Sequence, residues 1–259
     1  MSLSHPAYGQ LRPVTETASV LLADNPGLMT LDGTNTWVLR GRRSDEVVIV
    51  DPGPDDDEHI GRLADLGRIA LVLISHRHFD HTDGIDKLAE ATGAPVYSAG
   101  SGFQRRMGGG LIDGQVIDAA GLRITVLATP GHTADSLSFL LDDAVLTADT
   151  VLGRGTTVID SEDGDLARYL DSLQRLRGLG GRTVLPGHGP ELANIDAVAA
   201  GYLAHREQRL DQVRSALAAL GENATARQVV EHVYTDVAEE LWGAAEFSVQ
   251  AQLDYLRAT

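Results

Sequence analysis

Short apolar runs separated by turn-forming residues fill the first three quarters of the chain. Such runs predict strands, because a strand that is buried on one or both faces needs only a few apolar residues. The predicted strands are 14–23, 36–39, 46–50, 70–74, 95–98, 115–117, 122–128, 136–141, 144–146 and 182–185. Amphipathic stretches between them predict helices at 56–66, 84–92 and 165–179. The chain therefore contains both kinds of element and opens with a β-meander.

The pattern changes in the last quarter of the chain, where long helical periodicity replaces the strands. One amphipathic helix is predicted over 196–220, followed by helices over 225–240 and 246–257. The apolar positions of the first are Val198, Leu203, Leu210, Val213 and Leu217. We therefore expect one domain over 1–194 and a C-terminal helical appendage over 195–259.

Composition limits the chemistry and the partners. The chain has 259 residues, 43% of them hydrophobic, which is enough for a sizeable core. It contains no cysteine, so any metal site must use nitrogen and oxygen donors. The net charge of −16 disfavours long-range attraction of nucleic acid. The first residues lack the pattern of a secretory signal, and no apolar run approaches the roughly 20 residues that span a bilayer. We expect a cytoplasmic protein without membrane contact.

The densest candidate chemistry follows the apolar run 70–74. His76, His78, Asp80 and His81 stand within six residues, and three of the nine histidines of the chain are here. His76 and His78 point the same way if the chain stays extended. One metal ion cannot readily take four side chains from so short a loop, whereas two adjacent ions can. The alternative is a polar loop that happens to be rich in histidine.

Three more candidate ligands follow predicted strands or apolar runs. They are His132 in Thr-Pro-Gly-His, Asp149 in Leu-Thr-Ala-Asp and His188 in Leu-Pro-Gly-His. Together with the loop motif His-x-His-x-Asp-His, they resemble the metallo-β-lactamase fold hydrolases in order and spacing. The resemblance implies an α/β protein built as an αββα four-layer sandwich, in which two sheets face each other between outer helices. Periodicity alone indicates only that strands and helices both occur.

The resemblance also implies a pair of metal ions. The implied ligands are His76, His78 and His132 for the first ion, Asp80, His81 and His188 for the second, and Asp149 as a bridge between them. These donors suit two Zn²⁺ ions, although iron or manganese would also be compatible. Asp80 and Asp149 are the implied catalytic residues, because Asp80 would orient the water that the two ions share.

Three further residues are expected near the centre. Asp51 follows a predicted strand and would orient the metal loop; its alternative is an aspartate that starts the turn before Pro-Gly. Asn35 closes the long loop 25–35, which contacts substrate in the resembled family. Arg154 is a candidate for substrate contact. The expected cations nearest the metals are Arg77, Arg105, Arg106 and Arg154.

The remaining histidines have no motif around them. His59 is expected on the exposed face of a helix, and His5 and His232 on the surface, whereas His205 stays ambiguous. The segment 100–110 contains five glycines and is expected to be a mobile loop. Its two arginines could meet an anionic substrate, but a solvated linker is the favoured interpretation.

The chain resembles one subgroup in particular, the β-lactamase-like protein 2 type. The matching segments are Asn25-Pro26-Gly27, Gly33-Thr34-Asn35-Thr36, Gly155-Thr156-Thr157 and His205-Arg206-Glu207. Members carry a winged-helix-like appendage, which the three C-terminal helices resemble, and some cleave single-stranded RNA. However, residues 191–259 contain eleven acids and five arginines, whereas a nucleic-acid-binding winged helix is normally basic.

The expected activity is dinuclear, zinc-dependent hydrolysis by a hydroxide that bridges the metals. The substrate would be an ester, thioester, lactone or phosphodiester, since all of these suit such a centre. Two alternatives from the same fold are a single-stranded RNA endonuclease and a mononuclear iron persulfide dioxygenase. A non-catalytic nucleic-acid-binding module is a third, disfavoured by the acidic charge. We expect a small-molecule substrate, no membrane partner, and a possible homodimer through the C-terminal helices.

Overall fold

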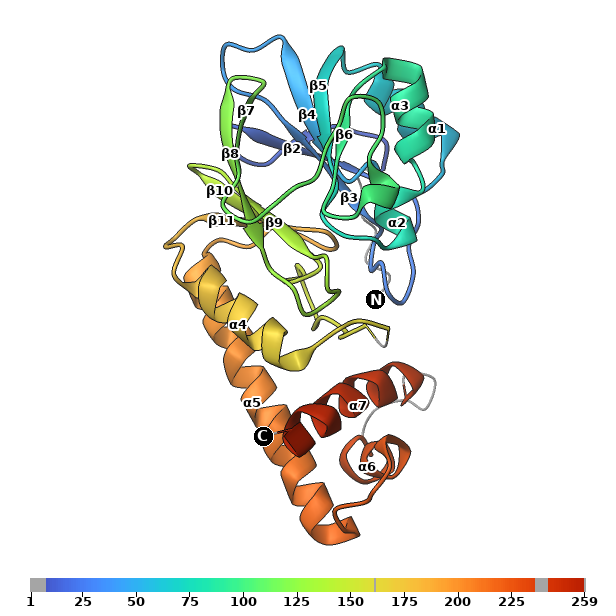
Figure 1. The fold of residues 1–259 in the computed structure, drawn as a ribbon, viewed down its shortest axis with the longest axis vertical. Coiled ribbons are helices and arrows are strands. Elements are labelled where there is room, and N and C mark those ends of the chain that lie inside the picture. The colour runs from blue at the N-terminus through green and yellow to red at the C-terminus, as the bar shows by residue number, and fades with distance from the viewer. Residues whose placement is uncertain (1–7, 161, 236–241, 259) are drawn as a thin grey trace.

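The computed structural model describes residues 8–160, 162–235 and 242–258, and its main body is built from two sheets that face each other (Figure 1). The first sheet has the order β1-β2-β3-β4-β5-β6 and the second the order β11-β10-β9-β8-β7. The strands of the first are β1 (Arg12–Pro13), β2 (Ala18–Leu22), β3 (Asn35–Leu39), β4 (Glu46–Val50), β5 (Arg68–Leu73) and β6 (Val96–Tyr97). Those of the second are β7 (Val116–Ala119), β8 (Leu122–Ala128), β9 (Leu137–Leu140), β10 (Ala144–Ala148) and β11 (Thr183–Pro186).

Most neighbouring strands are antiparallel, as expected for strands joined by short turns. The parallel pairs are β4 with β5, β5 with β6, and β10 with β11. Each of these pairs is linked through a helix that crosses the outer face of its sheet. The carboxyl ends of parallel strands lie at one edge, and the segments that follow β5, β10 and β11 carry the candidate ligands.

Three apolar layers hold the sandwich together. Between the sheets, Trp37 and Val50 of the first sheet belong to the same buried cluster as Phe139 and Leu146 of the second. The outer face of the first sheet is covered by α1 (Asp57–Ala64) and α3 (Ile85–Thr92). The outer face of the second is covered by α4 (Leu166–Arg177). The α/β sandwich with outer helices is therefore confirmed.

The regular elements described in the C-terminal part are all helices. It consists of α5 (Ile195–Leu220), α6 (Ala226–Val233) and α7 (Trp242–Ala258). Ile195, Ala199 and Leu210 of α5 belong to the cluster that contains α4, whereas Val213 and Leu217 pack with α6 and α7. The helix α5 therefore joins the body to the appendage (Figure 1). None of the described helices is long and apolar enough to cross a membrane.

Several local expectations need correction. A short helix, α2 (Phe79–Thr82), lies inside the metal loop, and a 3₁₀ turn, η1 (Ser101–Phe103), lies in the glycine-rich segment. Bridges between Val96 and Arg105 and between Ser98 and Gly110 hold this segment against the β6 region. The helix expected over 225–240 ends at Val233, and residues 236–240 lie outside the described part.

The prediction for His59 is wrong. Its side chain is buried, and its Nε2 lies 2.9 Å from the Thr36 Oγ1. The helix α1 turns this residue inward because Asp56 caps the helix by accepting a hydrogen bond from the His59 backbone, and the ring then faces the start of β3. His205 is partly buried, and His5 lies outside the described residues.

Candidate metal centre

The candidate ligands converge from both halves of the sandwich onto one edge. The chain leaves β5, passes His76 and His78 in extended conformation, and then turns into α2, which carries Asp80 and His81. From the second half, His132 follows β8, Asp149 follows β10 and His188 follows β11. All of these side chains except that of His78 are buried.

The donor atoms form two groups that meet at Asp149. The first group is His76, His78, His132 and Asp149, and the second is Asp80, His81 and His188; within each, the donor atoms lie within 4.8 Å of one another. Asp149 Oδ2 is 3.7 Å from His132 Nε2 and 3.3 Å from His188 Nε2. It therefore lies between the two groups, in the position expected for a bridge.

The nitrogens turned away from the centre all have oxygen partners. His81 Nδ1 lies 2.9 Å from an Asp51 carboxylate oxygen, and His78 Nε2 lies 3.1 Å from Asp160 Oδ2. The other three pairs are His76 Nδ1 with Ser75 Oγ at 2.9 Å, His132 Nδ1 with the Val158 carbonyl at 2.6 Å, and His188 Nδ1 with the Gly33 carbonyl at 3.1 Å. A histidine that donates its outer N–H turns the lone pair of its inner nitrogen towards the centre.

Buried carboxylates make this centre favourable for positive charge. Burial acts to raise the pKa of Asp80, but His81 and the hydrogen bond from His188 outweigh it and lower the pKa to about 2. Burial acts to lower the pKa of His81, but the charges of Asp80, Asp149 and Asp51 outweigh it and raise the pKa to about 9. A site that stabilises protons on histidine in this way also attracts divalent cations, which compete with protons for the same atoms.

The donor set fits a pair of metal ions. Donors at about 2.0–2.1 Å from a tetrahedral Zn²⁺ lie about 3.3 Å from each other. The donor pairs His76–His78 and His132–His78 are 3.0 Å apart, and His188 and Asp80 are 3.2 Å apart. The Oδ1 atom of Asp149 is buried without a hydrogen-bond partner. A buried carboxylate oxygen without a donor needs a cation, which these histidines can share.

Asp51, Asn35 and Arg154 lie near the centre in different roles. The Asp51 carboxylate accepts hydrogen bonds from the Ser75 backbone and hydroxyl and from His81. Asn35 donates to the carbonyls of Pro186 and Gly189, so it holds the turn that carries His188 and does not face a substrate. Arg154 forms a two-pronged ion pair with Asp32.

Sequence reasoning did not identify Ser75, Asp160 or the carbonyl of Val158 as partners of the ligands. Asp160 follows no strand and belongs to no motif, so it could be found only by its position beside His78. It also pairs with Arg77, which keeps that arginine turned away from a substrate. Arg105 is likewise paired, with Asp86 on α3.

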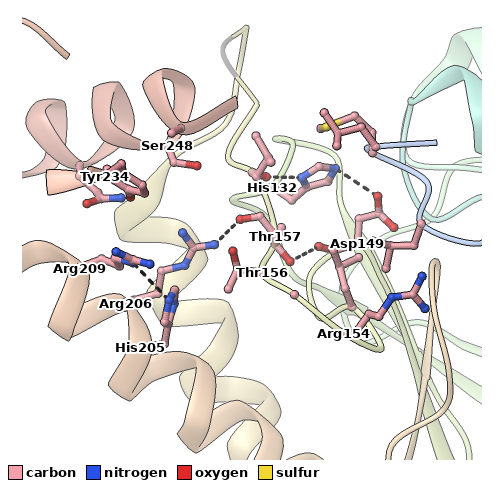
Figure 2. Close-up of a pocket in the computed structure, with 18 residues that line it drawn as sticks. His132, Asp149, Arg154, Thr156, Thr157, His205, Arg206, Arg209, Tyr234 and Ser248 are labelled. Atoms are coloured by element: carbon pink, nitrogen blue, oxygen red, sulfur yellow. Dashed lines mark hydrogen bonds and ion pairs between the residues drawn. The ribbon is translucent and has the colours of Figure 1, made fainter. Parts of the chain in front are cut away.

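A pocket of about 410 Å³ opens beside the centre. Figure 2 shows His132 and Asp149 on one side of this pocket and Arg206, Arg209, Tyr234 and Ser248 on the other. Leu28, Met29 and Leu31 of the loop 25–35 also line it. The volume is typical of sites for small ligands. The pocket therefore lies between the body and the C-terminal helices, with the candidate metal centre in one wall.

Comparisons with known proteins agree with this site. The family model of the metallo-beta-lactamase superfamily matches residues 29–188, and that of the beta-lactamase associated winged helix domain matches residues 225–259. The chain belongs to the metallo-beta-lactamase superfamily and is a metal-dependent hydrolase. Within it, the chain resembles the β-lactamase-like protein 2 type, with a winged-helix-like C-terminal part.

Two curated relatives illustrate this placement. The chain is 34% identical to an atrochrysone carboxyl ACP thioesterase of Aspergillus fumigatus over 76% of its own length and 64% of the relative. It is 30% identical to the beta-lactamase-like protein 2 homolog of Caenorhabditis elegans over 91% of its length and 81% of the relative. The chain thus spans under two thirds of the thioesterase and most of the second protein.

Solved structures share the fold over nearly the whole chain. A beta-lactamase domain protein from Burkholderia ambifaria superposes with a TM-score of 0.81 and 20% identity, over 99% of this chain and 90% of that one. A metallo-beta-lactamase family protein from Thermus thermophilus gives a TM-score of 0.77 and 23% identity, over 95% of both chains. At this identity, the likeness establishes the architecture only.

Proposed function

We propose that the protein is a dinuclear zinc hydrolase that cleaves a small ester or thioester. The observation that carries this proposal is the paired donor set, in which all five histidines have an outer oxygen partner and Asp149 lies between the groups. The first ion would be held by His76, His78 and His132, and the second by Asp80, His81 and His188. We also propose that the protein is cytoplasmic and that it forms a homodimer through the C-terminal helices.

Two bound divalent ions lower the pKa of a coordinated water and polarise the oxygen of the scissile bond. The protein has to hold the ligands and orient the substrate. Asp80 is fixed by the hydroxyl of Thr34, which donates to its Oδ2 at 3.0 Å, and its low pKa keeps it ionised. An ionised carboxylate held at this position would accept a hydrogen bond from the water at the centre and so orient it. The apolar side chains of the loop 25–35 would cover the acyl group.

An acyl substrate is favoured over RNA by the state of the cations. Non-specific RNA binding requires several cations along the phosphate backbone. Of the four arginines expected nearest the metals, Arg77, Arg105 and Arg154 are paired with carboxylates, and Arg106 donates to the Ala89 carbonyl. One relative is named a thioesterase, which supports an acyl substrate as well.

The mononuclear iron alternative is less compatible with the geometry. That class uses a reduced ligand set, whereas both donor groups are complete here. A site with one ion would leave the second donor group without a metal, although its two histidines and Asp80 are buried and oriented by hydrogen bonds. Elemental analysis should give two metal ions per chain, mainly zinc. One iron per chain would favour the oxygenase.

The decisive comparison is kcat/KM of the metal-loaded protein for small esters, thioesters and a short single-stranded RNA at two salt concentrations. We expect the acyl compounds to be preferred and RNA cleavage to be weak and sensitive to salt. The variant Asp149→Ala should lose turnover by orders of magnitude and still fold. RNA preferred by more than about 100-fold would overturn the acyl proposal, and full activity of Asp149→Ala would refute the assigned centre.

A further inference from the structure

The pocket has a second polar wall that hydrolysis at the metal centre does not require. His205, Arg206 and Arg209 of α5 lie there with Ser248 of α7 (Figure 2). Gln252 of α7 and Thr156 of the loop after β10 also line the pocket. These residues face the centre across the pocket. A wall of this kind can contact only a part of the ligand that is remote from the scissile bond.

Neither arginine in this wall forms an ion pair within the described part of the chain, although the whole sequence has a net charge of −16. Arg206 donates to the Thr157 carbonyl and lies 4.8 Å from the Tyr169 ring centroid. Arg209 lies 4.9 Å from the Tyr234 ring centroid and donates to Gln212 at 2.9 Å. No carboxylate among the described residues forms an ion pair with either arginine. Two positive charges three positions apart on α5 thus lack a carboxylate partner among the residues that the structure describes.

A third arginine of the same helix shows the contrast. Arg214 lies about one turn and a half further along α5. It is exposed, and it pairs with Glu207 at 2.9 Å and Asp211 at 2.7 Å. The exposed arginine of this helix is therefore neutralised by neighbouring carboxylates, whereas no described carboxylate pairs with the two arginines that line the pocket.

Most of the buried polar atoms without a partner belong to residues that line this pocket. Among the described residues, six buried side-chain polar atoms have no hydrogen-bond partner, and four of these belong to residues that line it. One is the Asp149 oxygen of the metal centre. The others are His205 Nδ1, Arg206 Nε and Gln252 Oε1. Since Arg206 is 3% exposed and Gln252 is 2% exposed, ordinary surface solvation does not account for them.

We propose that Arg209, with Arg206 and His205 beside it, forms an anion-binding subsite for a second, non-reacting group of the substrate. The bound group is a carboxylate or a phosphate, because the planar guanidinium fork matches the paired oxygens of both. Tyr234 packs on the Arg209 guanidinium and limits its freedom. This assignment rests on the proposed function. It narrows the substrate to an ester or thioester that carries a negative charge at the end remote from the scissile bond.

The size of the pocket restricts the ligand further. A cavity of about 410 Å³ accommodates a small molecule that spans from the metal centre to α5. One anionic group at the far end satisfies the unpaired cations, and the apolar side chains between the walls can cover the carbon chain that connects the two ends. A polyanion would need further cations along the pocket rim, where Arg154 is already paired with Asp32.

The test uses matched thioesters that differ in one charge. The first pair is an acyl thioester of 3-mercaptopropionic acid and that of 3-mercaptopropionamide; the second pair is a succinyl and a succinamoyl thioester of a neutral thiol. The metal-loaded protein should prefer the charged member of at least one pair by about tenfold or more, in kcat/KM. In Arg209→Gln the ratio of kcat/KM for the charged member to that for the neutral member should fall to near one. Arg214→Gln, the control on the same helix, should keep the full preference.

A binding measurement makes the subsite testable without turnover. Inorganic phosphate and succinate should raise the thermal unfolding temperature of the metal-loaded wild-type protein more than that of metal-loaded Arg209→Gln. The rise should be the same in wild type and in Arg214→Gln. The anion whose temperature rise differs more between wild type and Arg209→Gln identifies the group that the subsite binds. Equal shifts in all three proteins, or a charge preference that persists in Arg209→Gln, would overturn the subsite. Absence of hydrolysis of every ester and thioester tested would refute the proposed function instead, and the binding result would still decide the subsite.

Discussion

At the scale of single residues, strained backbone lies directly beside the metal ligands. Asp51 has φ 55° and Ala148, which precedes Asp149, has φ 45°. Residues other than glycine rarely adopt these values, and each such position costs roughly 1–3 kcal/mol. The strain at Asp51 is maintained by the hydrogen bonds that its carboxylate accepts from Ser75 and His81. The candidate ligands are therefore oriented by residues whose strained backbone lowers the stability of the fold.

The variant Asp51→Asn tests this orientation. Asparagine tolerates the left-handed backbone but has one acceptor oxygen, whereas three donors converge on the Asp51 carboxylate. His81 would lose its outer partner, so metal affinity should fall about 10–100-fold. Competition with a chelator measures it. Asp118→Ala, an exposed carboxylate of β7, is the control. Unchanged affinity in Asp51→Asn would show that this aspartate does not orient the ligand.

Gly187 tests the space around the bridge. A Cβ atom at this position would lie 2.3 Å from Asp149 Oδ1 and 2.9 Å from His81 Cε1. Gly187→Ala should therefore displace both ligands, leave fewer than two metals per chain, and lower turnover by about 100-fold. Gly61→Ala on α1 is a suitable control, because nothing lies within 4 Å of its Cβ position. Two metals and full turnover in Gly187→Ala would contradict the assigned bridge.

His59 makes stability depend on pH. Burial lowers its pKa from 6.5 to about 4, so between these values the unfolded chain binds a proton that the folded protein does not. The free energy of unfolding should thus decrease as the pH falls from 6.5 to about 4, by up to about 3 kcal/mol. His59→Gln, which can keep a hydrogen bond to Thr36, should remove this contribution. Urea unfolding of both metal-free proteins across this range measures it, and parallel profiles would exclude a role for His59.

At the scale of elements, apolar periodicity predicted the strands and long helices well, but it did not predict α2 or the inward direction of His59. The short helix α2 contains Asp80 and His81 in place of an apolar stripe, so its sequence resembles a polar loop. His59 faces inward because of the cap at Asp56, which periodicity does not register. The candidate ligands could be selected from the sequence because a motif fixes their order along the chain, and the structure brings them together in two groups.

Partners that are distant in sequence could not be predicted in the same way. Arg154 pairs with Asp32, and Asp160 with His78, across 122 and 82 residues. Such pairs depend on how the two sheets face each other, and no local sequence pattern encodes that arrangement. The second wall of the pocket was missed for the same reason. The segment His205-Arg206-Glu207 marks a resemblance in sequence, but only the packing of α5 shows which of its side chains face the ligand.

The helix α5 offers a stability test at this scale. Gly201 is exposed in the helix, and nothing lies within 4 Å of its Cβ position. Gly201→Ala should raise the free energy of unfolding by about 1 kcal/mol, because alanine loses less backbone entropy than glycine in a helix. The melting temperature should rise by about 2–4 °C. A lower melting temperature would show that Gly201 has a contact in solution, such as a second subunit.

At the scale of the whole molecule, the body and the C-terminal helices share one pocket. His132 and Asp149 contribute from the body, and Arg209 and Gln252 from the appendage. The helix α5 packs with α4 at one end and with α6 and α7 at the other, so it fixes the distance between the walls. Under the proposed function, the appendage would thus form part of the substrate site, and its acidic charge fits a small ligand better than a nucleic acid.

Because the ligands come from both halves of the sandwich, bound metal would act as a covalent cross-link does in secreted proteins. A chain without cysteine would in this way join His81 to His188 across 107 residues. At a free metal concentration 1,000 times Kd, binding adds about 4 kcal/mol to stability. Removal of metal by a chelator should thus lower the melting temperature by roughly 10 °C and bring both halves within reach of proteases. Scarcity of metal in the cell would then shorten the lifetime of the protein as well as abolish its activity.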